Sequence, residues 1–514
     1  MFFILIVLVC LITCLLLIDD FMKKCGSRWK RFAEFPGDTP LPIFGNAFQV
    51  GFDADAATEK FMGMWERYGK QNFRVLIGAQ QWVMVSEPDD IKTLLNDSNE
   101  LGKPLERNAA ITPFFGNSVS TSEGERWKFV RRLVTPCFHL KNIERAIDDF
   151  NKHEELFDIL DTFDGKGPVN VYYYLRPYML DMLKTSLFGV ESHFLKDPDH
   201  PYVVAVAKII RILTYNIFSY WRNIKIIFRW TPIYAEMQDI IKTITKQSTH
   251  MIAERRRKLD TMLKEFKNNN KNVDINDDTF IENKLSEGYL LDRLLLTKTP
   301  SGEILNDDII NEEIRLMLFT GHYTTSMTLS HTMYLLAKHP EVQQKVLEEQ
   351  ESILGKDLNN KATIQELNQM KYLESVLKEC MRTIPTVSRV GRYLKKDMAF
   401  TDGKVAPAGT TAIIFIDALS RNPKVYDEPE KFKPERFLES VHPFAFIPFS
   451  AGPRNCVAFR YAWMVMKVSL SNIIRRYEIL PGGPGTEPKF AFRVITESTN
   501  GMHLHLKRRY VSET

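Results

Sequence analysis

The sequence lacks a strong net charge, paired cysteines and internal repeats. Its 68 Lys and Arg residues nearly balance 64 Asp and Glu residues, so the composition does not favour a nucleic acid or a strongly charged substrate. Six cysteines are scattered without a Cys-x-x-Cys pair, which argues against a disulfide framework and is typical of a reducing compartment. The chain has 514 residues, 44% of them hydrophobic, which suffice for one large domain or two fused ones.

One cysteine stands in an unusual setting, at the end of the run Phe449-Ser450-Ala451-Gly452-Pro453-Arg454-Asn455-Cys456. Gly452 permits a turn that a side chain would block, and Pro453 stiffens that turn. Arg454 brings a positive charge towards the sulfur, which favours the thiolate, and Phe449 can keep water away from it. Without a neighbouring Cys or His a four-ligand zinc site is excluded, whereas a haem supplies its own remaining ligands. The alternative is an ordinary buried free cysteine.

The N-terminal residues Phe2 to Ile18 are almost unbroken apolar sequence. Such a helix is about 26 Å long, slightly short of a bilayer core. A cleavable signal peptide is the alternative, but no basic residue precedes the run and no Ala-x-Ala-like site follows it. Basic residues follow instead, namely Lys23, Lys24, Arg28, Lys30 and Arg31. The positive-inside rule then predicts a signal anchor in the endoplasmic reticulum membrane, with the rest of the chain on the cytosolic face.

The pattern predicts a long helix over 307–338, ended by His339-Pro340. Its middle is apolar on all sides, so the helix should be buried. Gly321 to Thr325 interrupts the apolar pattern with residues of poor helix propensity, and Thr side chains there can hydrogen-bond to the backbone. A polar break in a buried helix is where a ligand or cofactor would fit. A second predicted helix, 364–383, carries Glu379 and Arg382 on one face.

Four short signatures occur along the chain in a fixed order. They are Trp127-x-x-x-Arg131, Glu379-x-x-Arg382, Pro434-Glu435-Arg436-Phe437 and the run from His442 to Cys456. Together they resemble the cytochrome P-450 superfamily from about Phe35 to Lys507, and most closely its microsomal branch of fatty-acid ω-hydroxylases and insect enzymes. The resemblance implies a mainly α fold with small β-sheets (α+β) and a haem between the long buried helix and the cysteine loop. The chain then divides into an anchor (1–22), a basic and Pro/Gly-rich linker (23–45) and the catalytic domain (46–514).

The resemblance also assigns roles to individual residues. Cys456 is the axial ligand of the haem iron, on a loop that Phe449 and Gly452 shape. The haem propionates are held by Trp127, Arg131, Arg392 and Arg454, and Arg forks bind carboxylates in a bidentate manner. Glu379, Arg382 and Arg436 form a buried ion triad that supports the loop region. The cofactor is heme b (iron protoporphyrin IX).

The oxygen-activation motif departs from the branch at two positions. The branch reads Phe-Glu-Gly-His-Asp-Thr-Thr-Ser, whereas this chain reads Phe319-Thr320-Gly321-His322-Tyr323-Thr324-Thr325-Ser326. Gly321 and Thr324 match, but Tyr323 replaces the acid. A phenol with a pKa of about 10 releases its proton poorly near pH 7, which predicts slower turnover, peroxide leakage, or a relay through water or His322. Thr320 replaces a Glu that can form an ester with the haem, so the haem should be noncovalent.

Substrate contacts are expected on five segments: 105–117, 215–234, the buried helix, 385–390 and 498–501. The second segment is rich in aromatic residues, namely Tyr215, Phe218, Tyr220, Trp221, Phe228, Trp230 and Tyr234. They form either ordinary core or an apolar entrance that dips into the membrane. Both interpretations favour a lipophilic substrate.

The resemblance implies a membrane-bound haem-thiolate monooxygenase that hydroxylates or epoxidises a fatty acid, terpenoid or xenobiotic with O2. No nucleotide-binding glycine motif is present, so electrons come from NADPH-cytochrome P-450 reductase as a separate partner, with cytochrome b5 as a second donor. Six cations form either a docking face for that reductase or a scattered surface: Lys128, Arg132, Arg460, Lys467, Arg475 and Arg476. Two other functions stay open, a haem-thiolate isomerase or dehydratase acting on lipid hydroperoxides, and a non-catalytic haem-bound lipid carrier or sensor.

Overall fold

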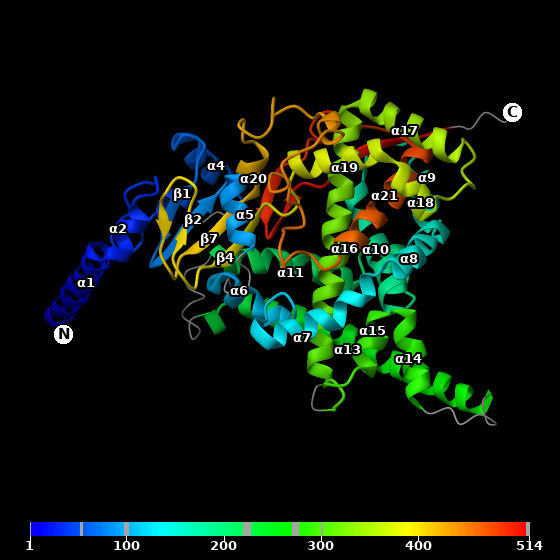
Figure 1. Ribbon diagram of the computed structural model, residues 1–514, viewed down its shortest axis with the longest axis horizontal. Coiled ribbons are helices and arrows are strands. Elements are labelled where there is room, and N and C mark those ends of the chain that lie inside the picture. The colour runs from blue at the N-terminus through cyan, green and yellow to red at the C-terminus, as the bar shows by residue number, and fades with distance from the viewer. Residues whose placement is uncertain are drawn as a thin grey trace.

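Helices make up most of the fold, as the sequence predicts (Figure 1). The computed structural model describes residues 2–51, 55–96, 102–218, 228–269, 277–299 and 302–509. In the first half the helices are α1 (Phe2–Cys25), α2 (Ser27–Ala33), α3 (Ala47–Val50), α4 (Ala57–Arg67), α5 (Pro88–Asn96), α6 (Leu105–Phe115), α7 (Gly124–Val134), α8 (Leu140–Lys152), α9 (Glu155–Asp161), α10 (Val171–Leu183) and α11 (Pro201–Phe218). In the second half they are α13 (Pro232–Asn269), α14 (Asp277–Glu287), α15 (Leu290–Leu296), α16 (Asp307–Lys338), α17 (Pro340–Leu354), α18 (Ile364–Gln369), α19 (Lys371–Thr383), α20 (Ile416–Ser420) and α21 (Phe459–Arg476).

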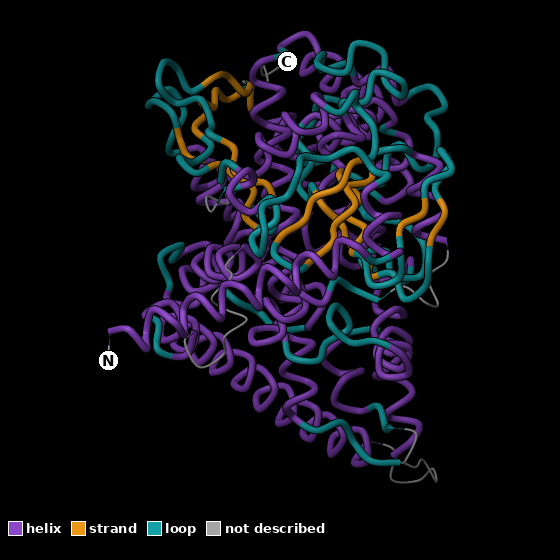
Figure 2. Tube along the Cα trace, turned by 90° about the vertical axis from the view of Figure 1, so that its left-hand side faces the viewer, coloured by secondary structure: helices purple, strands orange, loops and turns teal. Residues whose placement is uncertain are grey.

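In the described part of the chain the strands form four small sheets, which lie in separate places among the helices (Figure 2). One sheet has the order β1 (Phe73–Ile77), β2 (Gln80–Val85), β7 (Thr411–Phe415), β4 (Arg389–Tyr393). Its β2 and β7 run parallel, and its other neighbours are antiparallel. The remaining sheets are antiparallel: β3 (Val169–Asn170) with β11 (His503–Arg508) and β8 (Tyr477–Pro481), β9 (Phe490–Arg493) with β10 (Ile495–Ser498), and β5 (Met398–Ala399) with β6 (Val405–Ala406).

The long helix α16 has the predicted bounds and runs through the main core, where it packs against α10. Its N-terminus is capped by Asn306, whose side chain accepts a hydrogen bond from the Ile309 N–H at 2.9 Å. The predicted break over 321–325 is wrong, because the helix continues through it. The hydroxyl groups of Thr324 and Thr325 do donate to carbonyl oxygens four residues back, but these bonds leave the helix intact.

The second predicted helix, 364–383, is two helices that meet at Met370. The first, α18, begins with a capping box in which Thr363 and Glu366 exchange hydrogen bonds. The second, α19, carries both Glu379 and Arg382, as predicted. The spacing of the apolar residues did not reveal this boundary, because Met370 is buried like the apolar residues of both helices although its ψ of 77° is non-helical.

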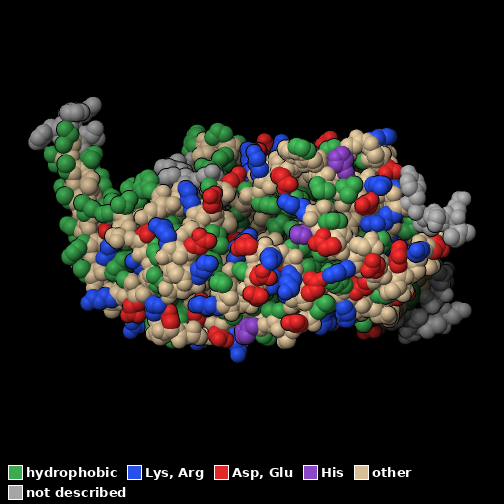
Figure 3. Space-filling model, turned by 90° about the horizontal axis from the view of Figure 1, so that it is seen from above, with side chains coloured by type: hydrophobic (Ala, Val, Ile, Leu, Met, Phe, Trp, Pro, Cys, Tyr) green, Lys and Arg blue, Asp and Glu red, His purple; other side chains and the backbone are tan. Residues whose placement is uncertain are grey.

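The N-terminal helix α1 projects from the body of the molecule with its apolar side chains exposed (Figure 3). Within the described part of the chain, no helix meets the length and hydropathy expected of a membrane span. The following segment, 23–45, includes the short helix α2, which was not predicted from the sequence. Phe32 and Phe35 of this segment are 0% and 1% exposed and join the core beneath the four-stranded sheet, so part of the connection is fixed to the body.

Candidate active site

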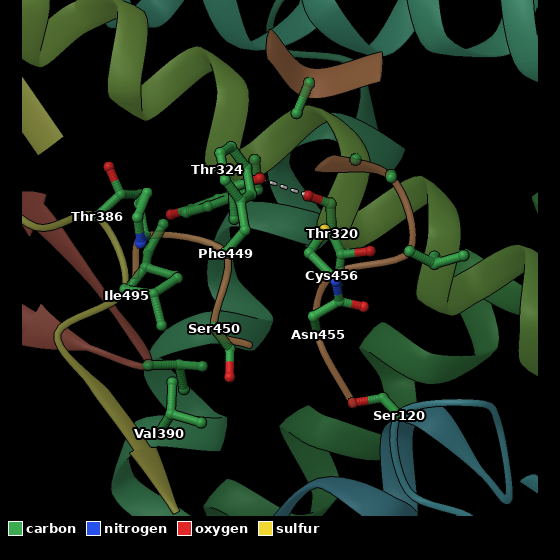
Figure 4. A pocket seen from close by; sticks show the side chains of 18 of the residues that line it. Ser120, Thr320, Thr324, Thr386, Val390, Phe449, Ser450, Asn455, Cys456 and Ile495 are labelled. Atoms are coloured by element: carbon green, nitrogen blue, oxygen red, sulfur yellow. Dashed lines mark hydrogen bonds between the residues drawn. The ribbon is translucent and has the colours of Figure 1, made fainter. Parts of the chain in front are cut away.

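A cavity of about 410 Å³ lies between α16 and the cysteine loop. Thr320 and Thr324 reach it from α16, and Phe449, Asn455 and Cys456 reach it from the loop (Figure 4). Gly321, Tyr323, Trp127, Arg131 and Arg454 line it as well. The structure therefore gathers residues that are more than 300 positions apart in the sequence around one cavity.

The cysteine loop is built from turns that the sequence predicts. Gly452 has φ of 70°, and a Cβ atom there would lie 2.3 Å from the Leu95 carbonyl oxygen, so only glycine fits. Ser450 also has a positive φ, of 59°. The Cys456 N–H donates to the Phe449 carbonyl at 3.0 Å, which closes the loop and leaves the thiol open to the cavity. The Phe449 ring packs edge-on against Trp463 with centroids 5.7 Å apart.

The electrostatic setting of Cys456 differs from the expectation. Burial raises the pKa of the Cys456 thiol, while the Ala458 backbone N–H and the Arg131 guanidinium act in the opposite direction. The charge that favours the thiolate is thus Arg131 and not the neighbouring Arg454. Arg131 also holds the loop, since its two terminal nitrogens donate to the carbonyl oxygen and side-chain oxygen of Asn455 at 2.9 and 2.8 Å.

Buried cations gather beside the cavity: Lys103, Arg107 and Arg454 line it, and Arg392 lies near them without lining it. Arg454 lies over the Trp127 ring at 4.6 Å and donates to the Ser122 carbonyl, and Arg392 is 1% exposed and donates to the Gly391 carbonyl. Burial and then mutual repulsion lower the pKa of Arg392 to about 10. Burial first, and then the charges of nearby cations, lower the pKa values of Lys103 and Arg107. Burial also lowers the pKa of Arg454 to about 10, although the charge of Glu123 acts in the opposite direction. A cluster of this kind is stabilised by a ligand that carries carboxylates.

Lys103 and Arg107 are members of this cluster that the sequence reading did not assign. Both line the cavity, and Arg107 donates to the carbonyl and the hydroxyl of Ser120 at 3.4 and 3.0 Å. No short motif surrounds them. The only signal in the sequence was their position: Arg107 lies within the segment 105–117, which the resemblance linked to substrate, and Lys103 lies just before it.

The predicted ion triad is assembled as expected. Arg382 donates to both carboxylate oxygens of Glu379 at 2.7 and 2.8 Å, and Arg436 donates to one of them at 3.1 Å. Glu379 and Arg382 are both 0% exposed. Arg382 also donates to the carbonyls of Ser420, Pro429 and Lys431. The triad therefore ties α19 to the irregular chain that leads to the cysteine loop.

On the opposite wall, hydroxyl groups of α16 face the cavity. Thr324 donates to the Thr320 carbonyl and Thr320 to the Leu316 carbonyl, both at 2.8 Å (Figure 4). Gly321 lets α10 approach closely, because a Cβ atom there would lie 2.7 Å from a methyl group of Leu183. The Thr320 hydroxyl has no carboxylate chemistry with which to attach a cofactor.

Tyr323 makes a contact that the sequence did not reveal. Its hydroxyl donates to Glu497 of β10 at 2.6 Å, and its ring stacks on Phe319 with centroids 5.6 Å apart. Burial, and then the nearby Tyr172 and Glu497, raise the pKa of Tyr323 well above its usual value. Burial lowers the pKa of His322 to about 4, and its Nδ1 hydrogen-bonds to the Leu318 carbonyl. His322 is therefore neutral near pH 7, which disfavours it as a charged proton relay.

The expected substrate segments reach the cavity in part. Ile111, Phe115, Ile217, Thr386 and Val390 line it, as do several residues of α16. The C-terminal hairpin reaches it through Val494 and Ile495, and the expected segment 498–501 does not. Of the aromatic residues in the second segment, Phe228 is buried and Trp230 is 87% exposed. Tyr220 and Trp221 lie outside the described residues, and so does the side chain of Phe218.

The six cations expected as a docking face divide into two groups. Lys128, Arg132 and Arg460 are exposed. Lys467 is 1% exposed and pairs with Glu374, and Arg475 is buried against backbone carbonyls. Arg476 pairs with Glu154 at 2.6 Å. The second group consists of internal contacts, so the face as a whole is smaller than the sequence suggested.

These features agree with what the comparisons with known proteins found. The family model for Cytochrome P450 matches residues 35–504, and the chain belongs to this family. Among its relatives, cytochrome P450 4d2 of Drosophila melanogaster is 33% identical over 96% of this chain and 97% of its own length. Cytochrome P450 4c3 of the same fly is 33% identical over 89% and 86%, and "Cytochrome P450 4e5, mitochondrial" of Drosophila mettleri is 31% identical over 86% and 83%.

The protein is therefore a cytochrome P450 haem-thiolate monooxygenase with heme b as its cofactor, as the sequence resemblance implied. Such an enzyme uses O2, a redox partner and a lipophilic substrate. The residues of the cavity fit the cofactor: a thiol opens into a largely apolar space, and the cluster of buried cations beside it matches two propionates.

Proposed function

We propose that the cavity between Cys456 and α16 holds the haem and that a lipophilic substrate is oxidised beside it. Cys456 would be the axial ligand. Trp127, Arg131, Arg392 and Arg454 would hold the propionates. The cation cluster carries this assignment, because buried Arg392 has no carboxylate partner among its hydrogen bonds in the described chain. The haem would be noncovalent, since Thr320 stands where an ester-forming Glu would be needed.

Bound haem would supply oxygen activation and one-electron chemistry, and the residues of the chain would form its surroundings. The Thr324 hydroxyl, which now donates to Thr320, can turn its O–H into the cavity and hold a proton there. The Glu379, Arg382 and Arg436 triad keeps the approach to the loop rigid. Apolar walls from Ile111, Phe115, Leu183 and Val390 exclude water and receive hydrocarbon.

The substrate class we propose is a fatty acid, terpenoid or xenobiotic, hydroxylated or epoxidised. The apolar walls and the similarity to insect relatives support this class. Electrons would come from NADPH through NADPH-cytochrome P-450 reductase, with cytochrome b5 as a second donor. Exposed Lys128, Arg132 and Arg460 would contribute to the docking face.

We further propose that residues 1–22 anchor the chain in the endoplasmic reticulum membrane, followed by the linker 23–45 and the catalytic domain 46–514 on the cytosolic face. Exposed apolar side chains along α1 support this, and so do Leu41, Phe44 and Phe48, which are 50%, 48% and 54% exposed. Protease treatment of microsomes tests the orientation. A fully protected chain would contradict it.

The absorption spectrum of the reduced, carbon-monoxide-bound protein is the first experiment, because it reports a thiolate ligand directly. Cys456→Ser should lose the thiolate signature, whereas Cys380→Ser, at a buried cysteine that does not line the cavity, should keep it. A screen of fatty acids, terpenoids and insecticides for spectral shifts then narrows the substrate. NADPH-dependent O2 uptake with the reductase should accompany turnover; consumption of a lipid hydroperoxide without NADPH would point instead to isomerase or dehydratase chemistry.

A further inference from the structure

The hairpin of β9 and β10 brings two residues, Val494 and Ile495, into the cavity wall. It pairs with no further strand in the described chain. An isolated two-stranded hairpin is only marginally stable in water, so its position depends on contacts with other elements. The position of this part of the cavity wall is therefore set by the contacts that hold the hairpin.

A chain of polar contacts links the hairpin to both the surface and α16. The Tyr323 hydroxyl donates to one oxygen of Glu497 at 2.6 Å, and Arg493 donates to the other at 3.0 Å. Arg493 also donates to both oxygens of Asp55 at 3.0 and 2.8 Å. Glu497 is 7% exposed and Tyr323 is 2% exposed, so their bond is shielded from water and from salt.

The turn of the hairpin is strained at the point where it meets the cavity. Val494 has φ of 63°, in the left-handed region that a β-branched side chain disfavours. A residue in this region is strained and persists only where its surroundings hold it. Glu497 lies three residues away on the adjoining strand, and Thr496 next to it donates to the carbonyls of Thr386 and Pro385.

The geometry favours a tether over a proton relay. Successive residues on a helix point about 100° apart, and the Tyr323 hydroxyl is directed to Glu497 while that of Thr324 is bonded to Thr320. The raised pKa of Tyr323 keeps its hydroxyl a hydrogen-bond donor at any physiological pH. The carboxylate accepts that bond without moving a proton towards the cavity.

We propose that Glu497 is a positioning residue that fastens the hairpin to Tyr323 and thereby restricts the cavity to slim, chain-like lipophiles. This rests on the proposed function in one respect, that the cavity is the substrate site. Val494 and Ile495 narrow the space while the bond is made. When it is lost, the strained turn relaxes and bulkier, ring-containing molecules gain room.

The test compares Tyr323→Phe with Tyr477→Phe in the full-length holoprotein. Tyr477 of β8 is also buried, and its hydroxyl donates to a carboxylate, that of Asp161, at the same 2.6 Å. That contact does not line the cavity, so Tyr477→Phe is a matched control. Each change removes one hydroxyl and keeps the ring.

Two readouts are measured. Amide hydrogen exchange over residues 490–498 should rise about three- to thirtyfold in Tyr323→Phe and stay unchanged in Tyr477→Phe. Optical titration should show the affinity for clotrimazole, relative to that for dodecanoic acid, rising by a similar factor in Tyr323→Phe alone. Glu497→Gln, which keeps an oxygen that can accept from Tyr323, should give a smaller change than Glu497→Leu.

Unchanged exchange in Tyr323→Phe would overturn the tether. Faster exchange with an unchanged ligand preference would overturn its role in selectivity, since a merely structural contact would behave in that way. Imidazole serves as the reference ligand. If the wild-type protein shows no spectral shift with imidazole, the proposed function fails, whereas the exchange measurement still tests the tether by itself.

Discussion

The two walls of the cavity are built in different ways. The wall with Cys456 comes from one short run of sequence, which closes on itself through the Cys456 N–H and the Phe449 carbonyl and which Leu95 and Arg131 hold from outside. The opposite wall depends on contacts between distant segments, such as the bond between Tyr323 and Glu497, which are 174 positions apart. Damage to the first wall should abolish the site, whereas damage to the second should alter what the site accepts.

The largest expected effect is from Glu379→Ala, on the cysteine side. The change leaves Arg382, which is 0% exposed, without its carboxylate, and removing one partner of a buried ion pair costs about 3–5 kcal/mol. We expect almost no haem in the purified protein, measured as haem per polypeptide. Glu435→Ala removes a neighbouring carboxylate whose pair with Lys345 is partly exposed, and it should keep its haem. Normal haem content in Glu379→Ala would refute the role of the triad.

Gly452→Ala should have the next largest effect. Its new methyl group would meet the Leu95 carbonyl, in addition to the strain of a positive φ. We expect loss of most of the thiolate signature in the carbon-monoxide spectrum. Gly165→Ala is the matched control, because Gly165 has φ of 68° with open space around it. Equal spectra for the two variants would mean that the close approach at Leu95 is unimportant.

On the α16 side, Glu313 should make stability depend on pH. Burial raises its pKa to about 8, while the Val119 N–H donates to both its oxygens at 3.0 and 3.2 Å. The folded state then binds a proton that the unfolded state has released between about pH 4.5 and 8. The free energy of unfolding should fall through this window as pH rises, by about 1.4 kcal/mol per pH unit. Urea unfolding at several pH values measures this slope, which should shrink in Glu313→Gln; an identical slope would contradict the prediction.

A several-fold effect is expected from restoring an acid at position 323. Tyr323→Asp alone places a second carboxyl in the buried space near Glu497, where two like charges disfavour each other. Combined with Glu497→Gln, it should raise product per NADPH at least about twofold, a small part of the roughly 10²–10⁴-fold that a positioned proton donor can supply. Glu497→Gln alone is the control. No gain in the double variant would indicate that Tyr323 does not limit proton delivery.

The smallest effect concerns the surface on the cysteine side. Arg132→Glu and Arg460→Glu should slow reduction by the reductase about twofold at low ionic strength, and the difference should vanish in high salt. Lys264→Glu, on the projecting helix α13, should leave the rate unchanged. Reduction rates that do not depend on ionic strength in any of the three variants would rule out electrostatic steering.

Much of the fold and site could be predicted because it follows from local rules. The bounds of α16 follow from its apolar pattern, from the Asn306 cap and from Pro340, and the Cys456 turn follows from Gly452. The division of the second helix at Met370 was missed, since its apolar periodicity continues across the boundary. The break expected in α16 was wrong because threonine hydroxyls can return hydrogen bonds without opening a helix.

Sequence by itself determined the family, the thiol, the ion triad and the departure at Tyr323, since each is a residue identity at a fixed local spacing. Only the tertiary structure decided which charges meet. It placed Lys103 and Arg107 beside Arg392 and Arg454, turned Lys467 and Arg475 inward, and brought Glu497 to Tyr323. The physical reason is that the energy of a charge or hydrogen bond depends on distance and burial, which local spacing does not specify for residues far apart in the chain.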